Sequence, residues 1–104
     1  MRVQFDDDFL AELTSKNGYN GKLPFPYEEA IKFKQRIFQI SNALNSNDLR
    51  TIKSLHFEKL KGKKYENKYS IRINKAYRLI FRIIDDEFKK IEIICIEEVS
   101  NHYG

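Results

Sequence analysis

Cationic and apolar side chains alternate along residues 69–82, and this stretch is the part of the chain best suited to chemistry. It consists of two runs, YSIRIN at 69–74 and YRLIFR at 77–82. The period-two alternation predicts a β-hairpin with one apolar face. Arg72, Arg78 and Arg82 then lie on the opposite face, where guanidinium groups can bind phosphate oxygens in a bidentate fashion. The pattern therefore predicts an anion site on the hairpin.

The turn of this hairpin decides how the arginines are placed. If Asn74–Ala76 is a three-residue loop, Ile73 pairs with Tyr77, and Arg72 lies directly opposite Arg78. Like charges in that position repel and destabilise the sheet unless an anion lies between them. A two-residue turn would shift the register and weaken the prediction.

Positive charge is concentrated in one segment of the chain. Residues 49–82 contain eleven Lys and Arg against two Glu, whereas the whole chain has a net charge of only +4. Such a concentration is typical of a polyanion-binding surface. The alternative is an ordinary solvated basic surface, which Lys-rich proteins often have.

The remaining elements predict a small α+β fold in a single domain, residues 1–104. Residues 1–5 are expected to form a strand, Asp6 to cap a short helix, and Asn17–Gly21 to form a loop. A long helix is expected from Pro26 to Leu44, with one more turn at 49–54. Its apolar positions are expected to face the core, namely Tyr27, Ala30, Ile31, Phe33, Ile37, Phe38, Ile40 and Leu44. Strands are expected at 55–60 and 90–99, the latter inside the sheet, with a charged turn at 85–87.

Several function classes are disfavoured by composition. The apolar runs are too short to span a membrane, and the acidic start of the chain does not resemble a signal peptide. The single Cys95 cannot form an internal disulfide and suits a reducing cytoplasm. Two histidines and one cysteine make no plausible zinc site, so we expect neither metal nor cofactor.

Residues 60–82 also carry a family resemblance. The sequence Leu60-Lys61-Gly62, followed by YSIRIN and then YRLIFR, resembles the HigB "plasmid maintenance killer" toxins of the RelE/ParE superfamily. The resemblance implies two or three N-terminal helices packed on a small, twisted, mainly antiparallel sheet. It further implies a cytoplasmic mRNA endoribonuclease that acts in the A site of the 70S ribosome without a metal. A helix-turn-helix antitoxin of the HigA type is the implied partner.

The resemblance also assigns residues. Lys61 matches the lysine of Leu-Lys-Gly, Arg78 matches the arginine of the Tyr-Arg step, and Arg72 matches a basic position of this branch. The family often ends in Asp-Tyr-His, whereas this chain ends in Asn101-His102-Tyr103-Gly104 and lacks the aspartate. We therefore expect Lys61, Arg78, His102 and Tyr103 at the catalytic site, and we expect RNA to be bound by Lys59, Lys63, Lys64, Arg72 and Arg82.

These residue types suit RNA cleavage. His102 titrates near neutral pH and can act as base or acid, while Lys61 and Arg78 can stabilise the charge on the phosphorane. Tyr103 can stack on an unpaired base or donate a hydrogen bond. Two alternatives stay open, because the missing aspartate weakens the acid–base assignment. One is a non-catalytic inhibitor of the ParE type, and the other is an RNA- or antitoxin-binding module without nuclease activity.

Overall fold

The computed structural model describes residues 1–15 and 25–101. Its helices are α1 (Asp8–Leu13), α2 (Tyr27–Asn42) and α3 (Ser46–Thr51), with short 3-10 turns at Lys53–Leu55 and Lys63–Tyr65. Its strands are β1 (Arg2–Phe5), β2 (Glu58–Lys59), β3 (Lys68–Arg72), β4 (Arg78–Asp86) and β5 (Ile91–Ser100). The predicted α+β class is confirmed, while the loop expected at 17–21 lies outside the described residues.

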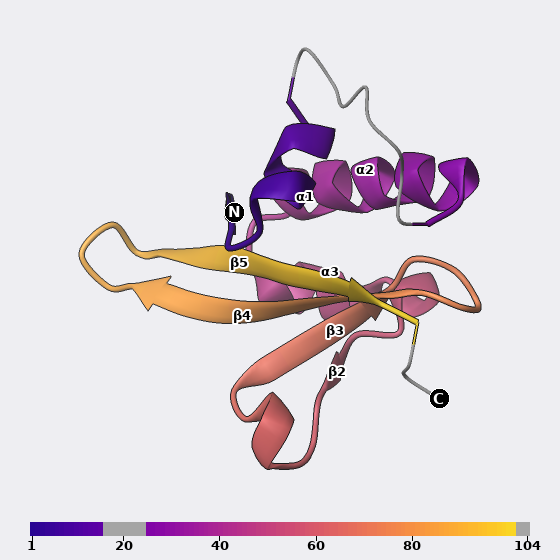
Figure 1. Cartoon of the computed structure of the whole chain (residues 1–104). Helices are drawn as coiled ribbons and strands as arrows, with labels where there is room; N and C mark the ends of the chain where they lie inside the picture. The colour runs from indigo at the N-terminus through magenta and orange to yellow at the C-terminus, as the bar shows by residue number, and fades with distance from the viewer. Residues whose placement is uncertain (16–24, 102–104) are drawn as a thin grey trace.

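The strands form one mixed sheet in the order β1-β5-β4-β3-β2. Strand β1 pairs with β5 in parallel, and every other neighbouring pair is antiparallel. Strand β5 therefore lies inside the sheet, as its continuous apolar run predicts. Helices α1 and α2 lie on one side of the sheet, and the β4–β5 hairpin projects beyond them (Figure 1).

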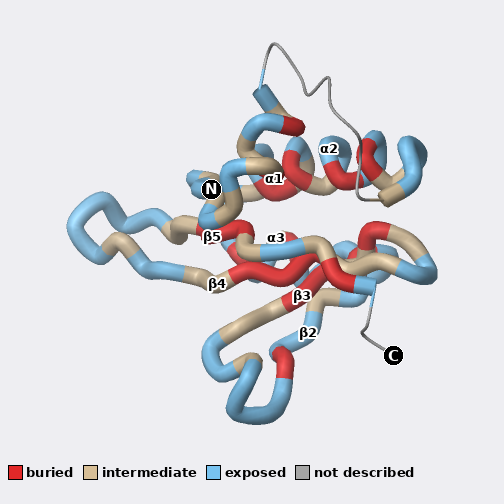
Figure 2. The backbone as a smooth tube through the Cα atoms, viewed as in Figure 1, coloured by how far each residue is buried: buried red, intermediate tan, exposed pale blue. Residues whose placement is uncertain are grey.

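The core lies between the helices and the sheet (Figure 2). Phe33 and Ile40 of α2 are fully buried, as are Ile71, Phe81 and Ile96 of the sheet. Burying side chains of this size stabilises the fold by about 1.5–3 kcal/mol each. The alternation along β3 and β4 thus places its apolar row against α2, as predicted.

Helix α2 was predicted with one apolar stripe, and this prediction is wrong. The buried side chains are Ala30, Phe33, Ile37 and Ile40, whereas Tyr27 is 71% exposed, Ile31 41%, Phe38 70% and Leu44 85%. At 100° per residue, Tyr27, Ile31 and Phe38 fall within a narrow arc away from the buried row. The helix therefore has one apolar row in the core and another towards solvent. It also ends at Asn42 rather than Leu44.

Other boundaries also differ from the prediction, among them the charged turn expected at 85–87, because Asp85 and Asp86 belong to β4. Asp7, not Asp6, caps α1, because its Oδ1 accepts a hydrogen bond from the Leu10 N–H at 2.9 Å. The Asp6 N–H instead continues the sheet and donates to the Ile96 carbonyl at 2.8 Å. The strand expected at 55–60 shortens to two residues, since residues 53–55 form a 3-10 turn. Helix α3 begins at Ser46 rather than Leu49, because Asn45 caps it.

No helix in the ranges 1–15 and 25–101 has the length and apolar content to cross a membrane.

The two phenylalanines of α2 give a test of this packing. Phe33→Ala should lower the free energy of unfolding by about 3–5 kcal/mol, because it leaves a cavity in the core. Phe38→Ala, on the exposed side of the same helix, should change it by less than about 0.5 kcal/mol. Urea unfolding followed by circular dichroism measures both. Equal losses in the two variants would contradict the arrangement.

Candidate active site

The β3–β4 turn is a three-residue loop, as predicted. The Ile73 N–H donates to the Tyr77 carbonyl at 2.9 Å, and Arg72 pairs directly with Arg78. Asn74 closes the loop, because its Oδ1 accepts hydrogen bonds from the N–H groups of Ala76 at 2.9 Å and Tyr77 at 2.8 Å. This side-chain turn fixes the register that brings the two arginines together.

Arg36 of α2 holds the same turn from the helix side. Its Nε donates to the Arg72 carbonyl at 2.8 Å, and its Nη2 donates to the Ile73 carbonyl at 3.4 Å. Burial lowers the pKa of Arg36 from its usual value. The guanidinium therefore serves as a structural link between α2 and the hairpin.

The guanidinium of Arg78 is held by acceptors from two neighbouring segments. Its Nε donates to Ser70 Oγ at 3.0 Å, and its Nη2 donates to the His56 carbonyl at 2.8 Å. The same Nη2 lies 3.5 Å from Glu58 Oε1, in an ion pair where the Arg78 side chain is 13% exposed and the Glu58 side chain 47%. The site therefore combines an oriented cation with a solvent-accessible carboxylate.

Glu58, Ser70 and the His56 carbonyl were not predicted from the sequence. Glu58 pairs with Ser70 across β2 and β3, and Ser70 pairs with Ile80 across β3 and β4. Glu58, Ser70 and Ile80 therefore lie in one row across the sheet. The signal for Glu58 is its position in that row, two residues before Leu60 of the Leu-Lys-Gly motif. The contact of Glu58 with Arg78 could not be predicted, because the sequence alone does not give the pairing of a two-residue strand.

The hairpin face that carries Arg78 is less open than predicted. Ser70 and Ile80 are fully buried on it, and Leu60 is only 3% exposed. Cys95, 1% exposed and paired with Arg82, is buried on the same side of the sheet, away from α2. Burial, and then the Asp6 carboxylate, raise the pKa of the Cys95 thiol, which keeps it protonated.

Arg82, predicted to bind RNA, takes part in ion pairs. Its Nη2 lies 2.9 Å from Asp6 Oδ2 and its Nε 2.8 Å from Glu97 Oε2, while Lys68 Nζ lies 2.8 Å from Glu97 Oε1. The hydrogen bond with Asp6 is the largest cause that raises the pKa of Arg82. Arg82 therefore links the segment before α1 to β4 and β5, and its charge is largely matched.

The predicted lysines lie at the β2–β3 end of the sheet. Lys59, Lys61, Lys63 and Lys64 are all exposed. Gly62 redirects the chain between them with a φ of 96°, a conformation that favours glycine. The Leu60 N–H donates to the Lys68 carbonyl, which continues the pairing of Glu58 with Ser70 along β2 and β3. Lys61 is three residues after Glu58, so its backbone lies roughly 10 Å beyond the Ser70 row that the Arg78 guanidinium reaches.

His102 and Tyr103 lie outside the described residues. Ser100, two residues before His102, pairs with Arg78 across β4 and β5. The structure thus brings Arg78, Arg72, Glu58 and the end of β5 together. It places the four lysines on the adjacent edge and engages Arg82 elsewhere.

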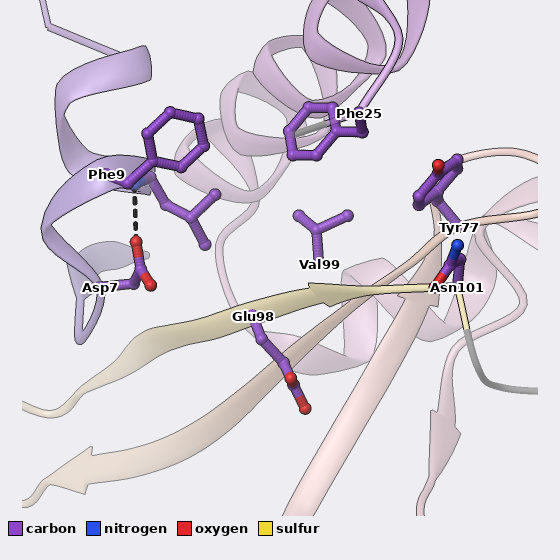
Figure 3. Close-up of a pocket in the computed structure, with 8 residues that line it drawn as sticks. Asp7, Phe9, Phe25, Tyr77, Glu98, Val99 and Asn101 are labelled. Atoms are coloured by element: carbon purple, nitrogen blue, oxygen red, sulfur yellow. Dashed lines mark hydrogen bonds between the residues drawn. The ribbon is translucent and has the colours of Figure 1, made fainter. Parts of the chain in front are cut away.

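A separate pocket, lined by both apolar and polar side chains, lies between the helices and the end of β5 (Figure 3). The rings of Phe9 and Phe25 meet edge to face at 6.3 Å between centroids, and Phe25 lies 6.1 Å from Tyr77. Val99 points into the pocket, whereas Glu98 points to the other side of the sheet. Val99 pairs with Leu79 in the core layer, so this pocket is on the opposite face from Arg78.

Known proteins resemble the chain in both sequence and fold. Residues 3–94 match the family model described as the RelE-like toxin of the type II toxin–antitoxin system HigB. An uncharacterized protein of Haemophilus influenzae is 35% identical over 91 residues, 86% of each chain. Toxin HigB-1 of Vibrio cholerae serotype O1 is 33% identical over 85 residues, 82% of this chain and 86% of its own.

Two solved structures share the fold. The YoeB/ParE toxin from Agrobacterium tumefaciens superposes with a TM-score of 0.54 at 17% identity, over 99% of this chain and 100% of its own. YafQ from Escherichia coli strain BL21(DE3) superposes with a TM-score of 0.59 at 12% identity, over 100% of both chains.

Arg82→Ala should lower the free energy of unfolding by about 1 kcal/mol, because Asp6 and Glu97 lose their shared cation at a partly exposed site. The loss should shrink as salt is added. Lys63→Ala, an exposed lysine in the 3-10 turn at 63–65, is the control and should leave stability unchanged. Chemical unfolding at low and high ionic strength measures both, and a loss independent of salt would contradict the ionic role.

Proposed function

The chain belongs to the RelE-like HigB toxins of type II toxin–antitoxin systems, and from that membership we propose that it is an endoribonuclease that cleaves mRNA in the A site of the 70S ribosome. The observation that carries the proposal is the placement of Arg78 beside Glu58 and opposite Arg72. Two arginines paired across neighbouring strands on one face of the sheet favour a phosphate near both.

RNA cleavage through the 2′-OH needs a base, positive charge at the phosphorane and an acid for the 5′-oxygen. Glu58 can take the 2′-OH proton, because its carboxylate is 47% exposed and lies beside the guanidinium that would hold the phosphate. Arg78 then stabilises the equatorial oxygens, and Lys61 adds positive charge from the adjacent edge of the sheet. His102 donates the proton to the leaving 5′-oxygen, and Tyr103 stacks on a neighbouring base or donates a hydrogen bond.

The substrate is held by the basic edge of the sheet. Lys59, Lys63 and Lys64 contact phosphates on one side of the scissile bond, and Arg72 contacts the scissile phosphate itself. Arg82 contributes less, because its guanidinium already bonds Asp6 and Glu97. These contacts do not depend on the RNA sequence, and the affinity that they provide decreases as the salt concentration rises.

The family implies an antitoxin as partner. We propose that this antitoxin is a helix-turn-helix protein of the HigA type. Action on the ribosome would place the chain in the cytoplasm.

Variants of the site test the nuclease. Arg78→Ala should reduce cleavage of ribosome-bound mRNA by about 100-fold or more, because it removes the oriented cation. Glu58→Gln should reduce it by about 100-fold, since the amide cannot accept the proton. Lys61→Ala and His102→Ala should also abolish growth arrest on induction. Lys34→Ala, an exposed lysine of α2 on the other side of the sheet, is the control and should arrest growth normally.

Two results would contradict the proposal. Intact mRNA together with inhibition of DNA gyrase would indicate a non-catalytic inhibitor of the ParE type. Soluble, folded protein that causes no growth defect would indicate a binding module without nuclease activity. Cleavage that survives in Glu58→Gln alone would retain the nuclease and exclude Glu58 as its base.

A further inference from the structure

A hollow lined by cations lies where the β3–β4 loop meets the first half of α2 (Figure 1). The helix and the hairpin both contribute to its lining, which comprises Lys32, Arg36, Arg72, Ile73, Asn74, Lys75 and Ala76. Four of these described residues are cationic and none is acidic. We call this feature the turn hollow. Apart from Arg72, it lies outside the residues predicted to bind RNA.

Contacts between α2 and the hairpin bring these cations together. The Arg36 Nε donates to the Arg72 carbonyl at 2.8 Å, which holds the helix against the end of β3. Lys32 lies one turn before Arg36 on the same face of the helix. Lys75 is the middle residue of the loop that follows β3. Lys32 and Lys75 therefore border the turn hollow from opposite sides.

The positive charge of the turn hollow is not neutralised within the described part of the chain. Lys32, Arg72 and Lys75 form no ion pair with a described carboxylate. Arg36 donates only to neutral carbonyl and amide oxygens. Glu29, three residues before Lys32, instead accepts a hydrogen bond from the asparagine of the loop. Cations gathered in a hollow without matching carboxylates attract an anion.

The turn hollow offers an anion charge but little apolar surface. Ile73 is only 1% exposed, and the other apolar residue of the lining is the small Ala76. Protein interfaces depend on large apolar or aromatic side chains that fill pockets on the partner. Nucleic-acid interfaces are more polar and more positively charged. The lining therefore suits a phosphate better than a protein segment.

Arg72 connects the turn hollow to the candidate active site. It is the last residue of β3, it lines the turn hollow, and it pairs with Arg78. The Cα atoms of directly paired residues are about 5 Å apart. The cations thus continue from Arg78 around the end of the sheet to α2.

We infer that the turn hollow binds a backbone phosphate next to the scissile one, on the same RNA strand. Lys32 and Lys75 contact that phosphate, and Arg72 lies between it and Arg78. The inference rests on the proposed function only in taking RNA as the polyanion. It implies that the RNA strand passes around the end of the sheet towards α2, in addition to its contacts along the β2 edge.

Binding of a 2′-O-methyl RNA oligonucleotide tests the inference, because this RNA lacks the free 2′-OH that cleavage requires. In fluorescence anisotropy, the double variant Lys32→Gln/Lys75→Gln should raise the Kd about tenfold and make the slope of log K against log salt shallower by about 0.7, the value for one lost phosphate contact. Both lysines are exposed, so the variant should keep its fold.

Lys34→Gln/Lys89→Gln is the matched control, because it removes the same net charge from two other exposed lysines. Lys34 lies on the opposite side of α2 from Lys32, since two residues turn the helix by about 200°. Lys89 lies in the turn between β4 and β5. The Kd of this control should stay within about twofold of wild type, because only distant charge is lost.

Several results would overturn the inference. One is a wild-type chain that does not bind the oligonucleotide, and another is a Lys32→Gln/Lys75→Gln variant that binds it like the control. Loss of sedimentation with empty 70S ribosomes at unchanged oligonucleotide affinity would assign the turn hollow to ribosomal RNA instead. Weaker binding of polyglutamate at unchanged oligonucleotide affinity would assign it to an acidic protein segment. If the wild-type chain binds the oligonucleotide but leaves ribosome-bound mRNA intact, the nuclease proposal fails while the comparison of the two double variants still decides the turn hollow.

Discussion

An arginine paired with a second arginine across two strands needs acceptors for its guanidinium, and this constraint organises the candidate site. Arg78 finds its acceptors on β3 through Ser70, on β2 through Glu58, and on the segment before β2 through the His56 carbonyl. The short strand β2 contributes little apolar burial of its own. It is therefore stabilised in part by the cation that it orients, so formation of this edge and formation of the site are coupled.

Both faces of the sheet support this arrangement. On one face Phe33 and Ile40 of α2 pack on Ile71 and Phe81, and this core sets the plane of β3 and β4. On the other, Ile80 is buried beside the residues that carry the site. A strand packed on both faces resists the small shifts that would separate Arg78 from its acceptors. Arg78 and Ser70 thus lie on packed strands rather than on a loop.

The hairpin could be predicted because its signals are local. The alternation of YSIRIN and YRLIFR gives both strands, and Asn74 suits a turn that it closes through its own side chain. Glu58 could not be predicted, since its contact with Arg78 depends on the pairing of a two-residue strand. The solvent-facing row of α2 was also missed, because apolar residues at helical spacing do not reveal which of two rows faces the core.

Strand β4 explains how one small sheet can present two unlike surfaces. It begins at Arg78 and ends at Asp85 and Asp86, so its ends carry opposite charge about 26 Å apart. That separation exceeds the Debye length of about 8 Å at physiological salt, so each end acts on its own surroundings. An anion is attracted to one end and repelled from the other, and a cation experiences the reverse. The charge pattern along the sequence therefore becomes a spatial separation of two oppositely charged surfaces.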